Sequence, residues 1–315
     1  MTIWVHKPVL ARNVIRLFEP ALKHSNNPIL LDCTLGLAGH TRLLLERFPK
    51  LRVIALDRDE SAIRVAKENL GDLIERVSIH QVKFDEYKRV LAEEGVEKVD
   101  AVFFDLGLSS MQIDDDDRGF SYIKNVKLDM RMNPDDELDA KYVLNNYEKD
   151  KLVCIFRLYG EEKFARQIAD GIVEFRERQQ IATSDQLRSI VKNSLPAALK
   201  FNDLSVQKRI FQSLRIEVND ELNILKTALT GIIDYVKVGG RIVAMSYHSL
   251  EDRIVKRNFK SLTEDKTPIG LPVKLPEFAP YAINLTPNVL IAGDAEKKSN
   301  PRSKSVKLRA IERVR

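Results

Sequence analysis

Cysteine and long apolar runs are what this sequence has least of. It contains only two cysteines, Cys33 and Cys154, among 315 residues. Two thiols so far apart make neither a disulfide framework nor the paired spacing of a zinc site. No apolar stretch approaches the roughly 18 residues of a membrane helix, and no secretory signal precedes the first patterned segment. We therefore expect a cytoplasmic protein without membrane spans or disulfide bonds.

Charged residues, in contrast, are abundant. The 51 lysines and arginines exceed the 46 acids, which gives a formal net charge of +5 and a pI near 9.0. Basic residues gather in the segment 297–315, where Glu312 is the only acid. Such a cluster suits a polyanion, because neutralising phosphates releases counterions. A solvated tail is the alternative, and charge alone leaves both open.

The first third of the chain alternates strand and helix patterns. Short apolar runs predict strands at 27–33, 51–57, 76–82 and 99–106, and helical spacing predicts helices at 39–48 and 59–70. Asp59 or Ser61 can cap the second of these helices. Apolar strands separated by helices indicate a parallel sheet covered on both faces.

The strand pattern stops after residue 106 and returns only at 239–248 and 305–314. Between these segments the spacing is helical. We predict an α/β core built from residues 1–112 and 205–315, with an all-helical domain inserted at 113–204. That insertion is the expected substrate-recognition domain.

Three places fall at predicted strand ends, where ligands bind in an open α/β sheet. They are the turn "LDCTLGLAGHT" (31–41), with Gly36 and Gly39, then Asp57, and then Asp105. The dinucleotide fingerprint G-x-G-x-x-G is absent. S-adenosylmethionine (SAM) carries a sulfonium and no pyrophosphate, so the turn favours SAM over NAD. A plain turn with solvated acids is a third interpretation.

Eight segments together resemble one family. They are "HKPVL" (6–10), "LDCTLGLAGH" (31–40), "DLGLSSMQIDDDDRGFSY" (105–122), "LDMRMNP" (128–134), "YGEEKFARQIA" (159–169), "FQSLRIEVNDEL" (211–222), "SYHSLEDRIVKR" (246–257) and "NPRSKSVKLRAIER" (300–313). In this order, and over nearly the whole chain, the sequence resembles the RsmH (MraW) family of SAM-dependent small-subunit rRNA cytidine N4-methyltransferases.

The resemblance implies a class I SAM-dependent methyltransferase core, Rossmann-like, with a helical insertion. It implies SAM as the cofactor, the small ribosomal subunit as partner, and the N4 amine of a 16S rRNA cytidine in the decoding region as substrate. Two alternatives stay open: a nicotinamide-dependent oxidoreductase, and a non-catalytic ribosome-assembly factor with a vestigial SAM site. Both a monomer and a homodimer are compatible with the sequence.

The resemblance also assigns the cofactor site. The matching positions are Ala38, Gly39, His40, Asp57, Phe84, Asp105 and Gln112. Two positions depart from the family pattern, which often has glycine in place of Ala38 and proline in place of Met111. If residue 38 needs a positive φ, alanine costs on the order of 1 kcal/mol there.

Candidates for the chemistry are fewer. Many amino-methyltransferases have an Asp/Asn-Pro-Pro-aromatic turn after strand four, which this chain replaces with the sequence 105–110. The candidates are Asp105, Ser110 and His248. Ser249 and Asp252 resemble a capping box at the start of a helix. Its basic face at 253, 257 and 260 suits either RNA phosphates or solvent.

The acidic run 114–117 raises the question of a metal. A calcium loop starting at Asp114 needs glycine at its sixth position and glutamate at its twelfth. Gly119 fits and Asn125 does not, so we predict no metal. Asp114 and Asp115 match the family pattern and are expected to shape the loop, whereas Asp116 and Asp117 are expected to be solvated.

Overall fold

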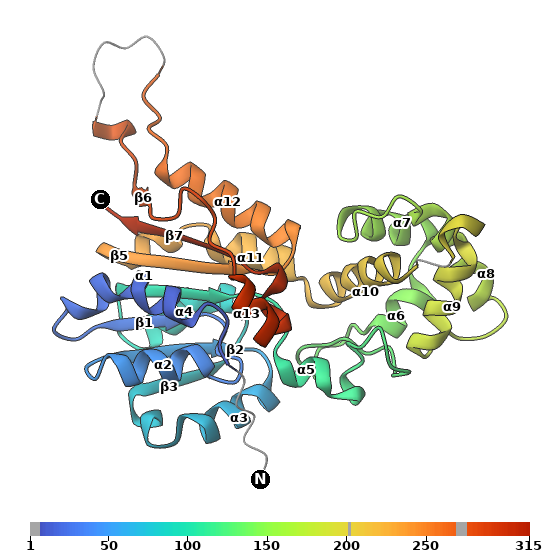
Figure 1. Ribbon diagram of the computed structural model, residues 1–315, viewed down its shortest axis with the longest axis horizontal. Coiled ribbons are helices and arrows are strands. Elements are labelled where there is room, and N and C mark those ends of the chain that lie inside the picture. The colour runs from blue at the N-terminus through green and yellow to red at the C-terminus, as the bar shows by residue number, and fades with distance from the viewer. Residues whose placement is uncertain (1–6, 201–202, 269–275) are drawn as a thin grey trace. The chain divides into compact units, whose positions relative to one another are not determined.

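The chain folds into two compact units (Figure 1). The computed structural model describes residues 7–200, 203–268 and 276–315. One unit, here called the core unit, comprises Met1–Gly107 and Leu222–Arg315. The other, the helical unit, comprises Leu108–Glu221.

The core unit is built on one seven-stranded sheet with the order β3-β2-β1-β4-β5-β7-β6. The strands are β1 (Ile29–Asp32), β2 (Arg52–Asp57), β3 (Val77–Gln81), β4 (Val99–Asp105), β5 (Val236–Ser246), β6 (Ala282–Asn284) and β7 (Lys307–Arg313). Strands β1 to β5 pair in parallel, and β7 pairs antiparallel with both β5 and β6. This is the predicted class I methyltransferase architecture, so the fold class is confirmed.

Helices cover both faces of the sheet. On one face, α1 (Ala11–Lys23), α2 (Gly39–Arg47) and α3 (Glu60–Leu70) pack against side chains of the strands. On the other face lie α4 (Tyr87–Glu93), α11 (Glu221–Leu229) and α12 (Ser249–Thr263). Successive strand residues alternate between the two cores, as Phe103 and Phe104 show. Both faces are apolar, which explains the continuous apolar runs in the sequence.

The helical unit has a core of its own. Its helices are α5 (Ser110–Asp114), α6 (Ala140–Asn146), α7 (Lys149–Leu158), α8 (Ala165–Arg176), α9 (Ser184–Ser194) and α10 (Leu204–Asn219). The predicted insertion at 113–204 begins and ends inside this unit. Helix α10 packs against α6, α7 and α9, burying side chains such as Ile210 and Leu214. These contacts extend the unit to Glu221.

A loop between α5 and α6 carries the acidic run. Asp115 accepts a hydrogen bond from the backbone N–H of Asp117 at 3.0 Å and so shapes the loop as predicted. Asp116 is exposed and pairs with exposed Lys124 at 2.8 Å, an arrangement of little energetic weight. Arg118 is buried and donates to the carbonyl oxygens of Arg131 and Met132.

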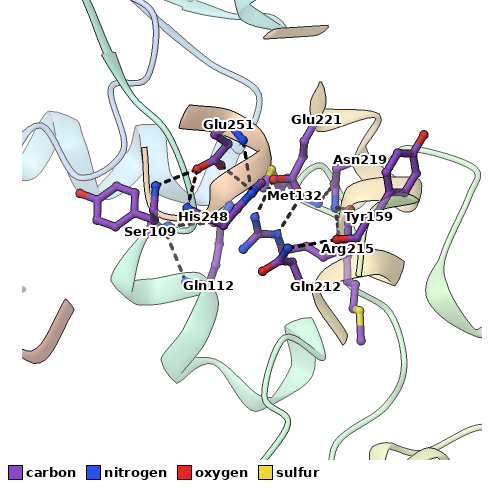
Figure 2. Close-up of polar contacts among 12 residues, drawn as sticks. Ser109, Gln112, Met132, Tyr159, Gln212, Arg215, Asn219, Glu221, His248 and Glu251 are labelled. Atoms are coloured by element: carbon purple, nitrogen blue, oxygen red, sulfur yellow. Dashed lines mark hydrogen bonds and ion pairs between the residues drawn. The ribbon is translucent and has the colours of Figure 1, made fainter. Parts of the chain in front are cut away.

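Asn219, at the end of α10, holds the segment after this loop (Figure 2). Its Oδ1 accepts from the Met132 N–H at 2.8 Å, and its Nδ2 donates to the carbonyls of Met130 and Arg215 at 2.7 and 2.9 Å. Arg215 in turn makes two hydrogen bonds of 2.8 Å to Glu221. The motifs at 128–134 and 211–222 therefore meet inside the helical unit.

Within the described ranges, no helix has both the length and the apolar character that a membrane span requires.

Candidate functional site

Three carboxylates stand where neighbouring parallel strands end. Asp32 ends β1, Asp57 ends β2 and Asp105 ends β4. Because β1 lies between β2 and β4, these ends share one edge of the sheet, here called the carboxyl edge. Ligands of open α/β sheets bind at such an edge.

Asp32 holds the turn that follows β1. Its carboxylate accepts from the Thr34 N–H at 3.1 Å and from the hydroxyl of Thr41, which lies in α2. Burial raises the pKa of Asp32 to about 6, although both hydrogen bonds act in the opposite direction. The sequence marks Asp32 only as a strand end; its bond to Thr41 fixes both sides of the turn.

Asp57 faces the same turn from β2. Its Oδ2 accepts from the Gly36 N–H at 2.7 Å, and its Oδ1 accepts from the Asp59 N–H at 2.9 Å. Burial raises the pKa of Asp57 to about 6, against the lowering effect of these two amides. Each carboxylate oxygen retains a second lone pair, so Asp57 can still accept two hydrogen bonds from a diol.

Ala38 precedes α2 with a left-handed backbone, at φ 62°. Its methyl group is fully buried in the core beneath the turn. The sequence-based concern about this position is therefore met in the structure, because a non-glycine residue occupies a conformation that favours glycine.

We expect Ala38→Gly to change the free energy of unfolding by less than about 1 kcal/mol. Relief of left-handed strain is worth about 1–2 kcal/mol, whereas the lost methyl burial costs about 0.8 kcal/mol and the extra freedom of glycine in the unfolded chain costs roughly 0.4–1 kcal/mol. Urea unfolding measures the change. Ala38→Val is the comparison and should lose more than about 2 kcal/mol through strain and overpacking. A stabilisation above 2 kcal/mol by glycine would contradict this balance.

His40, Asp105 and Tyr247 form a chain of contacts across the carboxyl edge. The Nδ1 of His40 lies 3.2 Å from Asp105 Oδ2, and the Tyr247 hydroxyl donates to Asp105 Oδ1 at 2.8 Å. The Nε2 of His40 donates to the Val9 carbonyl at 2.8 Å, and the Asp105 N–H donates to the Thr34 hydroxyl at 2.6 Å. The chain thus ties the segment before α1 to the ends of β4 and β5.

Both ring nitrogens of His40 face acceptors, which favours the imidazolium. Burial alone would lower the pKa of His40, but the hydrogen bond and negative charge of Asp105, with the Val9 carbonyl, raise it above its ordinary value. The His40 side chain is 8% exposed. It therefore supports the site through Asp105, and the sequence gave no sign that Tyr247 or Val9 takes part.

Phe84 follows β3 and is partly buried. Its ring packs edge-on against Phe104 of β4, with ring centroids 5.8 Å apart. The other aromatic residues at this edge are Tyr247 and Phe103, which contact the His40–Asp105 chain. Phe84 therefore offers an aromatic wall beside the ends of β3 and β4.

The start of α12 differs from its prediction. The capping residue is His248, whose Nδ1 accepts from the Glu251 N–H at 3.4 Å, whereas Ser249 is the first helical residue. Glu251 returns the bond by accepting from the N–H groups of Tyr247 and His248 at 2.8 and 3.2 Å (Figure 2). The predicted box of Ser249 and Asp252 is wrong, because Asp252 pairs with Lys307 and Arg309 of β7.

These contacts also describe the catalytic candidates. His248 has its Nε2 3.0 Å from Glu251 Oε1, so both ring nitrogens face Glu251. Asp105 keeps a side chain that is 25% exposed. The side chain of Ser110 lies outside what the structure describes. Gln112 belongs to the helical unit, where it is buried and forms a capping box with Ser109.

The electrostatics of the carboxyl edge select the kind of ligand. The charge of Asp105 raises the pKa of Asp32, and the charge of Asp32 raises that of Asp57. The three carboxylates therefore lie close enough to repel one another, with His40 as the cation beside them. Such an edge attracts a positively charged ligand and repels a pyrophosphate.

Comparison with known proteins gives consistent matches over the full chain. A model of the MraW methylase family matches residues 4–314. A ribosomal RNA small subunit methyltransferase H from Saccharopolyspora erythraea is 44% identical over 311 residues, covering 98% of this chain and 94% of the relative. The protein of the same name from Mycolicibacterium smegmatis is 43% identical over 313 residues, covering 98% and 84%. Among solved structures, an rRNA methylase from Streptococcus thermophilus matches at 12% identity with a TM-score of 0.45, over 99% of this chain and 100% of that one.

Proposed function

The chain belongs to the MraW methylase family, and on that premise we propose that it transfers a methyl group from SAM to 16S rRNA of the small ribosomal subunit. The acceptor is the N4 amine of a cytidine in the decoding region. The observation that carries the proposal is the carboxyl edge, which combines a diol-accepting Asp57 with a surplus of negative charge.

The residues at this edge fit SAM. When bound, SAM supplies an electrophilic methyl group on a positively charged sulfur. Asp57 would accept hydrogen bonds from the ribose diol, and Phe84 would line the adenine. Asp105 would lie near the methionine portion, where its charge suits the sulfonium and the amino group. Ala38 and Gly39 would contribute backbone at the turn, His40 would support it through Asp105, and Gln112 would come from the helical unit.

The acceptor chemistry requires a hydrogen-bond acceptor near the amine. A cytosine N4 amine is a poor nucleophile because its lone pair is delocalised into the ring, so accepting its hydrogen bonds and later its proton assists transfer. Asp105 has one donor on each oxygen and a further lone pair on each. His248 has both nitrogens facing Glu251. Asp105 is therefore the better candidate for this contact.

The helical unit is the element that would hold RNA beside the core unit, in agreement with its predicted role in substrate recognition. A base within paired RNA must leave its stack to react, whereas a single-stranded base is easier to reach. The partner would be the small ribosomal subunit, and the expected compartment is the cytoplasm. Membership in a methylase family excludes the nicotinamide-dependent oxidoreductase interpretation of the turn.

Methyl transfer is tested with labelled SAM and small subunits from cells that lack this modification. We expect nucleoside mass spectrometry to show N4-methylcytidine in 16S rRNA, and subunits from wild-type cells to accept no further label. Absence of N4-methylcytidine, or methylation of another atom, would contradict the proposal. The vestigial-site alternative predicts that Asp105→Ala leaves cellular function intact, which we do not expect.

A further inference from the structure

A second polar pocket lies in the core unit at the end of β5. It has a volume of about 320 Å³, near the lower end of the range for small-ligand sites. Its lining combines two segments that are distant in sequence, the start of α12 and the turn before β7. The lining residues are Tyr247, His248, Ser249, Ile291, Lys297, Lys304, Ser305, Val306 and Lys307.

The lining is strongly basic. Three lysines contribute to it, and no aspartate or glutamate does so among the residues that the structure describes. Lys307 has its charge partly answered by Asp252, 3.2 Å away. Lys297 lies 3.9 Å from Asp294, whose side chain is 95% exposed, so that pair is weak. The ammonium groups of Lys297 and Lys304 are therefore available to an anion.

The rest of the lining adds hydrogen-bond donors of the kind that phosphates use. Ser249 and Ser305 carry hydroxyl groups, and Ser249 is the first residue of the 15-residue helix α12. Backbone N–H groups and the dipole at such a helix start favour negative charge. Lysines, hydroxyls and helix starts are the usual contacts of nucleic-acid phosphates.

The pocket adjoins the carboxyl edge through Tyr247, which lines it and also donates its hydroxyl to Asp105 at 2.8 Å. We propose that this pocket binds a backbone phosphate of the RNA next to the target cytidine, with Lys297 and Lys304 as its main contacts. The inference rests on the proposed function for the identity of the RNA. Anchoring a flanking phosphate would position the base at the edge without reading its sequence.

The test is a pair of charge-removing substitutions, Lys297→Gln with Lys304→Gln, in the full-length protein. Lys307 is left intact because it also pairs with Asp252. The matched control is Lys298→Gln, which removes one charge from the next residue of the same helix, α13 (Asp294–Ser299), and does not line the pocket. A second comparison is the double substitution of the two lysines by arginine, which keeps the charge.

Three quantities are measured: the Kd for unmodified small subunits at several KCl concentrations, the Kd for SAM, and the rate of methyl transfer at saturating subunits. We expect the Lys297→Gln, Lys304→Gln variant to bind subunits at least tenfold more weakly. The salt dependence of log Kd should also fall by roughly 0.7–0.9 per lost phosphate contact. Its affinity for SAM should stay within twofold. Lys298→Gln should bind like the wild type, and the arginine variant should retain most of the affinity.

Three results would overturn the inference. They are unchanged binding of subunits, an equal loss in Lys298→Gln, and a loss of SAM affinity in place of subunit affinity. The last would assign the pocket to an anionic group of the cofactor. If the wild type binds subunits with this lysine dependence but makes no N4-methylcytidine, the phosphate pocket stands and the proposed function fails.

Discussion

Replacing Asp57 with asparagine is expected to weaken SAM binding by about 100-fold or more. The carboxylate accepts one backbone N–H on each oxygen, from Gly36 and Asp59, and would accept the ribose diol on the remaining lone pairs. An amide has one accepting oxygen, so its NH₂ group would face one backbone N–H and one ribose hydroxyl. Hydrogen bonds to a charged group are worth about 1.5–3 kcal/mol each, and two of them correspond to at least two powers of ten.

The same carboxylate predicts a pH dependence. Burial raises the pKa of Asp57 to about 6, and the diol is bound by the ionised form. Affinity is therefore full above pH 7 and lost as pH falls through 6. At pH 5 about one molecule in ten would carry the ionised group, which lowers SAM affinity roughly tenfold. Calorimetric titration with SAM between pH 8 and pH 5 measures both effects.

The control for both measurements is Glu60→Gln. Glu60 is exposed in the first turn of α3, three residues after Asp57, so the substitution removes the same charge without touching the site. Its Kd for SAM should stay within about twofold, with the pH dependence intact. A flat profile for the wild type, or Asp57→Asn binding within threefold of it, would show that Asp57 does not hold the ribose.

Gly119→Ala is expected to destabilise the helical unit by more than about 3 kcal/mol. Gly119 has φ +73°, and an added Cβ would lie 2.2 Å from the Lys127 carbonyl oxygen and 2.8 Å from the Asp129 nitrogen. Left-handed strain costs about 1–2 kcal/mol, and displacing the backbone of 127–129 adds a further overpacking cost of about 1–3 kcal/mol. That backbone cannot move freely, since Leu128 and Met130 hydrogen-bond to Ala182 and Arg118.

Gly95→Ala separates the two contributions. Gly95 also has a positive φ, +65°, but an added Cβ meets no atom within 4 Å. It should cost only about 1 kcal/mol. Scanning calorimetry is suitable because two units can unfold in separate transitions. Equal losses for the two substitutions would mean that the contact with Lys127 relaxes at little cost. Gly119→Ala should also reduce methyl transfer, in proportion to the unfolded fraction of the helical unit.

The sequence predicted the strands and their ends well, because burial on both faces leaves unmistakable apolar runs. The four strands predicted between 27 and 106 appear as β1, β2, β3 and β4, and Asp59 caps α3 as one of the two residues proposed for it. The carboxyl edge could therefore be located before any contact was known. Helix α1 and the three-residue strand β6 were not predicted.

Side-chain partners were predicted less well, since they depend on strands that meet only in the folded sheet. Both His248 with Glu251 and Ser249 with Asp252 have the spacing of a capping box. Asp252 is taken by Lys307 and Arg309, which come from β7 more than 50 residues later. Likewise, His40 meets Asp105 because β1 and β4 are neighbours. Local spacing contains neither fact.

The strand order also bears on how the chain folds during synthesis. β7 is made after the other six strands, yet it lies between β5 and β6. Residues 108–221 of the helical unit leave the ribosome well before β7 does, by several seconds at roughly 5–20 residues per second. During that interval β5 is an open edge with an apolar surface and β6 has no strand to pair with. Exposed edges of this kind invite aggregation, so the nascent core is most vulnerable just before its final strand arrives.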